Sequence, residues 1–211
     1  MAKRSNLANA WKSERLVYRA VEDDDEDKLS LLELNDGEPS GMAMLNIKPL
    51  APGNKTSSDK FLTWAKGALI LAFVCLPPEE NQDQKAEGGE KKKPRPKPIG
   101  FLVMWYSRGA ESAHHRTAEM GFGFGPQHRG KGYGTEAINW LLDWGFMRMG
   151  LHRVGLQAFE YNPEAIRLYK RLGFVEEGRE REALLFERKW YDLVHMGMLE
   201  HEWEKLRELG K

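Results

Sequence analysis

The 211-residue sequence has a single cysteine, Cys75, and no long apolar run. One cysteine cannot form an intrachain disulfide, which fits a reducing compartment. The longest apolar run, residues 68–76, is much shorter than the roughly 18 residues that span a bilayer. The polar residues 1–9 lack the apolar centre of a secretion signal. These absences predict a cytoplasmic protein that does not insert into a membrane.

The sequence also has no excess charge of either sign, because 32 basic residues balance 32 acidic ones. A general nucleic-acid binder would need a basic excess, so no nucleic-acid partner is expected. The histidines form no metal-binding motif: His114 and His115 lie in a polar connection, and no H-E-x-x-H occurs. A chain of this length favours one domain, spanning 1–211, at roughly 150 residues per domain. We therefore expect one domain without a metal.

One segment, residues 77–98, differs from the rest in composition, with five prolines and almost no large apolar residue. Such a stretch buries too little apolar surface to offset the entropy of ordering it, so we predict a mobile loop insertion. Strand-like runs on both sides, residues 69–76 and 99–106, indicate an enlarged hairpin connection. The basic part, residues 91–97, is read as solvated charge, with a nuclear signal or an acid-binding patch as the alternatives.

The remaining pattern alternates strands and helices. Helices are predicted after an acidic run at 22–27, over 58–68, and from about 135, where an apolar stripe runs from Ile138 to Met149 before Gly150. Asn162 as N-cap and Pro163 as first residue begin another helix. The acidic run is read as a helix first turn, or alternatively as a polycation site. Residues 36–58 look irregular, and strands are predicted over 15–21, 69–76, 99–106, 117–124, 154–159, 175–185 and 190–199. This order predicts an α/β or α+β domain with one main sheet.

A glycine-rich stretch, residues 125–135, lies between a predicted strand and a helix and reads GPQHRGKGYGT. The backbone N–H groups of glycines are not covered by side chains, and a helix N-terminus adds a partial positive charge. Together they favour binding of an anion, most naturally a phosphate or pyrophosphate. Two nucleotide patterns fit in part. The first is the P-loop, but Gly132 stands where that motif ends in Ser or Thr. The second is the dinucleotide fingerprint in its form G-x-G-x-x-A, but the match does not open the βαβ unit that this fingerprint requires.

A third pattern, R/Q-x-x-G-x-G/A, is matched fully by residues 129–134, and residues 161–174 match N-x-x-A-x-x-L-Y-x-x-x-G-F. At these two motifs the chain resembles the GNAT superfamily of N-acetyltransferases. Residues 177–181, 190–199 and 202–203 resemble its subgroup of ribosomal-protein alanine and spermidine acetyltransferases.

The resemblance implies a GNAT-like fold, a mixed and strongly twisted sheet with helices on both faces. It implies acetyl-CoA as cosubstrate, with Phe122 to Phe124 pairing with the pantetheine arm through their backbones, and it leaves a homodimer as an expectation. Asn162 would contact CoA or the catalytic tyrosine, besides capping its helix. The expected cofactor-binding residues are Phe122, Gly123, Phe124, Arg129, Gly130, Lys131, Gly132, Tyr133, Gly134, Thr135 and Asn162.

Acetyl transfer requires a base for the amine and an acid for the departing thiolate. Tyr169, matched to the family's tyrosine, is the candidate acid, with a core packing role as the alternative. Glu119, on the strand before the loop, is the candidate base, with an exposed strand glutamate as the alternative. Cys75 is expected to be a buried core thiol, which favours direct transfer over an acyl-enzyme.

The sequence therefore predicts an acetyl-CoA-dependent N-acetyltransferase. Its acceptor would be a primary amine on a polyamine or other small molecule, a protein N-terminus or a toxin. The alternatives are a non-catalytic acyl-CoA-binding regulatory module and, because of the near P-loop, a nucleotide-binding switch.

Overall fold

The strands of the chain form a single mixed sheet in the order β1-β2-β3-β4-β5-β7-β6. A computed structural model describes residues 9–36, 54–77 and 95–209, and all strands and helices named here lie within them. All neighbouring strands pair antiparallel except β4 and β5, which are parallel. The strands are β1 Val17–Ala20, β2 Ile70–Cys75, β3 Pro98–Tyr106, β4 Thr117–Phe124, β5 Arg153–Phe159, β6 Val175–Phe186 and β7 Lys189–Leu199.

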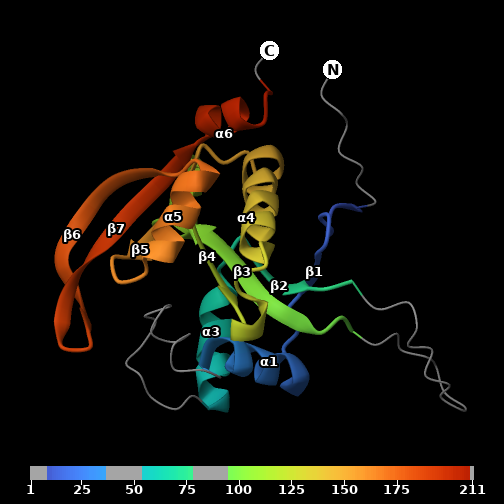
Figure 1. Ribbon diagram of the computed structural model, residues 1–211. Coiled ribbons are helices and arrows are strands. Elements are labelled where there is room, and N and C mark those ends of the chain that lie inside the picture. The colour runs from blue at the N-terminus through green and yellow to red at the C-terminus, as the bar shows by residue number, and fades with distance from the viewer. Residues whose placement is uncertain (1–8, 37–53, 78–94, 210–211) are drawn as a thin grey trace, which may run out of the picture.

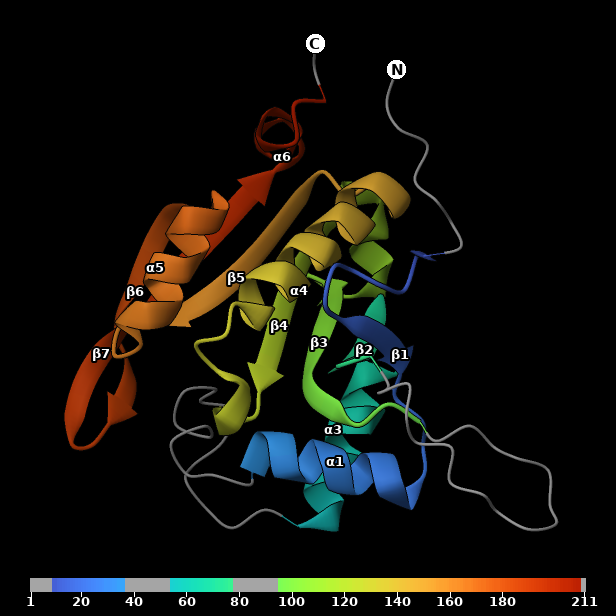
Figure 2. The same cartoon turned by 45° about the vertical axis from the view of Figure 1, so that its right-hand side comes forward.

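Helices cover both faces of this sheet, as predicted. Figures 1 and 2 show α4 and α5 together on one side of the sheet, while α1 crosses α3 at the end occupied by β1 to β3. The longer helices are α1 Asp25–Asp36, α3 Lys55–Ala65, α4 Tyr133–Asp143, α5 Pro163–Leu172 and α6 Glu200–Leu206, and the short turns are η2 Ala110–His115, η3 Pro126–His128 and the π-helix η4 Trp144–Arg148.

Alternation along the strands divides the core into two layers. On β2, Val74 joins the large cluster under α4 and α5, whereas its neighbour Phe73 joins a smaller cluster with Leu31 of α1 and Leu62 of α3. Phe101 of β3 belongs to the smaller cluster as well. The sheet is therefore buried on both faces in its N-terminal half, which explains the nearly continuous apolar sequence of β2 and β3.

The C-terminal helix is fastened to α4 by polar contacts. The indole N–H of Trp203 and the Nε of Arg207 both donate to Asp143 Oδ1, each at 2.8 Å. Arg207 also reaches Asn139 Oδ1 at 2.7 Å. These bonds hold α6 beside the far end of α4, away from its N-terminus.

The sequence placed two helix boundaries wrongly. α3 begins at Lys55 rather than 58, because Asn54 and Ser57 form a capping box in which Asn54 Oδ1 accepts the Ser57 N–H at 3.2 Å. Residues 55–58 are therefore helical rather than irregular, and the helix ends at Ala65 rather than 68. The stretch 37–53, also predicted to be irregular, lies outside the described residues.

The helix after the glycine loop also differs from its prediction. Regular α-helix stops at Asp143 and a π turn follows, which shifts the buried face. Met149, predicted to end the apolar stripe, is 41% exposed, and Phe146 is buried in its place.

The two strands predicted on either side of the enlarged hairpin connection are confirmed, since β2 and β3 pair antiparallel. Most of the loop predicted at 77–98, namely residues 78–94, lies outside the described residues. Across the ranges that the structure describes, no helix combines the length and apolar character needed to cross a membrane.

Candidate active site

The two parallel strands at the centre of the sheet pair over only three residues each. Thr117, Ala118 and Glu119 of β4 align with residues 153–155 of β5, and no described strand pairs with β4 on that side beyond Glu119. Figure 2 shows β4 and β5 diverging toward their C-terminal ends. Along Phe122, Gly123 and Phe124 the β5 side of the strand is thus open to an extended ligand, except at the Phe124 carbonyl, which Arg129 bonds.

The predicted anion loop lies directly after this open strand edge. Gly130 and Gly132 have φ of +71° and +81°, a conformation that favours glycine. Gly132 is the N-cap of α4, and no side chain caps the helix there. The first amides of α4, at Tyr133, Gly134 and Thr135, therefore remain available to an anion.

Basic side chains surround the loop, but they do not all face outward. Arg129 turns its Nε back to the carbonyl of Phe124 at 3.0 Å and so closes the loop onto β4. Lys131 is exposed. Burial, helped by Lys131 and Lys97, lowers the pKa of His128 below its usual value. The loop thus has a positive electrostatic environment beyond that of the helix dipole.

An N-terminal segment supports this loop, which sequence reasoning missed. Ser13 Oγ and the backbone N–H of Arg15 donate to Glu136 Oε1 at 2.6 and 2.7 Å, and Arg15 Nε donates to Oε2 at 2.8 Å. Arg15 Nη1 also reaches the carbonyl oxygen of Lys131 at 3.0 Å. No local sequence signal could reveal these contacts, because more than 100 positions separate the partners.

Tyr169 projects from α5 toward the open edge of β4. Asn162 caps α5 by accepting the Ala165 N–H at 3.2 Å, so its capping role is confirmed, while its contact with CoA stays a prediction. The Tyr169 ring meets Phe122 edge-on, with centroids 6.1 Å apart. Tyr169 is 8% exposed, and its hydroxyl has no hydrogen-bond partner among the described residues. Burial raises the pKa of this phenol above its ordinary value, which keeps it protonated.

Glu119 lies at the point where β4 and β5 separate, in a row of charged side chains. Its carboxylate is 3.7 Å from Arg153 Nη1, and Arg153 also pairs with Glu177 of β6. Gly155 and Gly197 leave room for this row, since a Cβ at either position would collide with Glu119 or Glu177. Burial raises the pKa of Glu119, and Arg153 and His195 only partly oppose this increase.

The two candidate catalytic residues approach the strand gap from opposite faces of the sheet. Met120 packs in the large cluster that contains Tyr169. Glu119 precedes Met120 on the strand and therefore points to the other face, as alternation predicted. A group held between β4 and β5 would be accessible to Tyr169 from one side and to Glu119 from the other.

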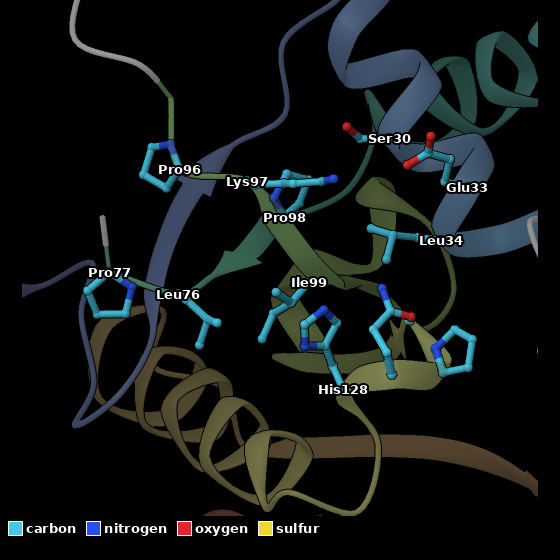
Figure 3. Close-up of a pocket in the computed structure, with 13 residues that line it drawn as sticks. Ser30, Glu33, Leu34, Leu76, Pro77, Pro96, Lys97, Pro98, Ile99 and His128 are labelled. Atoms are coloured by element: carbon cyan, nitrogen blue, oxygen red, sulfur yellow. The ribbon is translucent and has the colours of Figure 1, made fainter. Parts of the chain in front are cut away.

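A separate cavity of about 380 Å³ borders the start of the glycine loop. Figure 3 shows Leu34 of α1, Ile99 of β3 and His128 of η3 at its walls. Neither Tyr169 nor Glu119 lines it. The cavity therefore belongs to the α1 side of the loop rather than to the gap between β4 and β5.

The other chemistry-bearing residues take structural positions. Cys75 is fully buried, and burial raises the pKa of its thiol to about 11, so it is a core thiol as predicted. No group of three or more potential metal ligands occurs within the described ranges. His195 pairs with Glu180, with Nε2 and Oε1 2.7 Å apart.

The acidic run at the start of α1 is engaged by cations of the chain itself. Asp27 is buried and receives two hydrogen bonds of 2.8 Å from Arg19. Asp24 pairs with Arg95 at 2.8 Å, and Lys28 holds another carboxylate of the run. A polycation at this position would have to compete with these ion pairs.

The fold of this chain is similar to that of solved GNAT acetyltransferases. A GNAT-family acetyltransferase from Bacillus anthracis matches with a TM-score of 0.67 and 23% identity, covering 90% of this chain and 98% of that one. Spermidine N-acetyltransferase from Vibrio cholerae, solved with CoA and spermine, matches with a TM-score of 0.69 and 22% identity, covering 90% and 99%.

The sequence of the central segment is similar to the same family. Residues 85–174 match the model of the acetyltransferase (GNAT) family, which confirms the predicted resemblance. A spermidine N(1)-acetyltransferase of Vibrio cholerae is 37% identical over 86 residues, which are 41% of this chain and 50% of that protein. The putative ribosomal N-acetyltransferase YdaF of Bacillus subtilis is 34% identical over 90 residues, 43% and 49% of the two chains. The chain thus spans about half the length of the curated relatives it matches.

Proposed function

We propose that the protein is an acetyl-CoA-dependent N-acetyltransferase that transfers the acetyl group directly to a primary amine. The observation that carries this proposal is the gap between β4 and β5, which adjoins the uncapped start of α4 and is approached by Tyr169 and Glu119 from opposite faces. This arrangement suits two substrates that meet in one site, and Cys75 is too deeply buried to carry an acyl group between them.

The chain's own residues fit the donor. Acetyl-CoA would supply the acetyl group as a thioester and a pyrophosphate as an anchor. The amides of Gly132 to Thr135 would hold the pyrophosphate, and Lys131 would add charge. The backbone of Phe122, Gly123 and Phe124 would pair with the pantetheine arm and donate an N–H to the developing oxyanion.

Glu119 and Tyr169 would handle the two protons. Glu119, directly or through a water, accepts a proton from the amine whose nitrogen bonds to the acetyl carbon. As the bond from that carbon to sulfur breaks, Tyr169 donates its hydroxyl proton to the departing thiolate and regains one from solvent. The products are the N-acetylated amine and CoA. The raised pKa values of both groups suit these roles, since Tyr169 stays an acid and Glu119 gains basicity.

The acceptor is proposed to be cationic, with a polyamine or other small amine first. Glu119, Glu177 and Glu180 lie along the sheet face that the acceptor would approach, and the two last are more than a third exposed. One relative is named for spermidine and another for a ribosomal substrate, which makes a protein N-terminus the second candidate.

The test is an acceptor screen that measures thiol release from acetyl-CoA with spermidine, spermine and peptides with a free N-terminus. Product mass must increase by one acetyl group at an amine. Tight acetyl-CoA binding without turnover on any amine would instead favour the non-catalytic regulatory module.

A further inference from the structure

The anion loop and the N-terminal segment before β1 are joined through one arginine. Arg15 bonds two groups that flank the first residues of α4 in sequence, namely the carbonyl of Lys131 and the carboxylate of Glu136. Its guanidinium also lies over the Tyr133 ring, 5.0 Å from the centroid. A Cβ on Gly132 would stand 3.2 Å from Arg15 Nη2, so the arginine packs directly against the N-cap glycine.

The bond to Lys131 sets the direction of the next amide. A trans peptide is planar, and its C=O and N–H groups point to opposite sides. Because Arg15 holds the Lys131 carbonyl at 3.0 Å, the N–H of Gly132 must point away from Arg15. That amide is the first of the series that the helix N-terminus offers to an anion.

The bond to Glu136 removes a charge conflict. Glu136 is in the first turn of α4, where its carboxylate competes with any bound anion for the positive end of the helix. Burial pushes its pKa up, but hydrogen bonds from Ser13 and Arg15 outweigh this effect and lower the pKa, so the group is ionised. Arg15 places a positive charge 2.8 Å from that carboxylate.

We propose that Arg15 is a positioning residue for the donor site: it orients the peptide between Lys131 and Gly132 and neutralises Glu136. The loop then presents amides and no unpaired negative charge to the pyrophosphate of acetyl-CoA. This inference rests on the proposed use of the loop for acetyl-CoA.

The experiment compares acetyl-CoA with S-acetylpantetheine, which has the same thioester arm but no pyrophosphate. Arg15→Ala should raise the Kd and KM for acetyl-CoA about tenfold, as expected when hydrogen bonds involving a charged group are lost. It should leave the acceptor KM and the kcat/KM for S-acetylpantetheine unchanged. Adding Glu136→Gln to Arg15→Ala should recover part of the acetyl-CoA affinity, because the unpaired carboxylate is then gone.

Arg116→Ala is the matched control, since Arg116 also bonds a backbone carbonyl, that of Gly150, and a carboxylate, that of Glu200. It should leave the acetyl-CoA Kd unchanged. If the alanine variant does not fold, Arg15→Lys replaces it in the experiment. Lysine keeps the positive charge but lacks the planar guanidinium that bonds both groups, so this variant should still weaken acetyl-CoA binding.

The possible failures of the two proposals differ. Wild-type affinity in Arg15→Ala, or an equal loss with both donors, would overturn the role of Arg15 alone. Failure of the wild-type protein to bind acetyl-CoA would overturn the proposed function itself.

Discussion

Tyr169→Phe separates catalysis from packing, because the substitution removes one oxygen atom and leaves the ring. The ring's edge-on contacts with Phe122 and Phe174, at centroid distances of 6.1 and 6.0 Å, would remain. The hydroxyl bonds to no described residue, so its loss leaves no partner unsatisfied. The free energy of unfolding should therefore change by less than about 1 kcal/mol.

Catalysis should respond very differently. Loss of a positioned acid lowers kcat by about 10²-fold or more, which corresponds to roughly 2.7 kcal/mol of barrier. Since burial raises the pKa of Tyr169 above its ordinary value near 10, the phenol stays protonated over roughly pH 6 to 9. The defect should then be of similar size throughout that range.

The assay measures kcat from thiol release at saturating acetyl-CoA and amine. Thermal unfolding of the same preparation measures stability. Tyr106→Phe is the matched control, because Tyr106 packs against the same core from the end of β3. A nearly normal kcat in a folded Tyr169→Phe variant would refute the reasoning and leave Tyr169 a packing residue.

Four further substitutions test other parts of the molecule. Gly132→Arg should abolish acetyl-CoA binding in calorimetry, because it places a side chain at φ +81° against the anion site; retained affinity would mean that the loop is misplaced. Arg153→Gln should move the acid limb of kcat/KM to higher pH, since Arg153 lowers the pKa of Glu119, whereas Glu119→Gln should remove that limb and about 10²-fold of the rate. An unmoved limb in Arg153→Gln would point to another base. Asp143→Ala should lower the free energy of unfolding by about 1–2 kcal/mol in denaturant titration by freeing the Trp203 indole, and unchanged stability would contradict the fastening of α6.

The fold could be predicted wherever a local signal marks an element. β4 was predicted with its observed bounds of residues 117–124, because turn residues flank a short apolar run. The start of α5 was recognised from Asn162 and Pro163, and the structure ends the helix at Gly173, whose φ is +97°. The start of α3 was missed because its capping box is formed by Asn54 inside a stretch that reads as irregular.

The π turn after α4 shows a different limit. A periodicity of 3.6 residues assumes continuous α-helix, so one extra residue at Trp144–Arg148 shifts each later position around the axis. Met149 was therefore assigned to the buried face and proved exposed. Leu151 and Met104 also pack closely against Gly145 within this turn, a tertiary contact that a periodicity count does not include.

The site divides in the same way. The glycine loop and Tyr169 lie in contiguous motifs and could be found, whereas the partners that tune them come from distant strands. Arg153 and Glu177 meet Glu119 only because β4, β5 and β6 come together in one sheet. Arg15 reaches Glu136 across 121 positions. The sequence thus indicated the candidate groups but not the residues that contact them.

Calorimetric titration of the wild-type protein with acetyl-CoA tests the central claim most directly, with ATP·Mg²⁺ and NADH as controls. The account predicts selective binding of acetyl-CoA with a Kd of about 1 μM, or roughly 8 kcal/mol of binding free energy. Gly132→Arg should abolish the heat of acetyl-CoA binding. Absence of acetyl-CoA binding, or preference for either nucleotide control, would contradict the assignment of the loop and every catalytic role built on it.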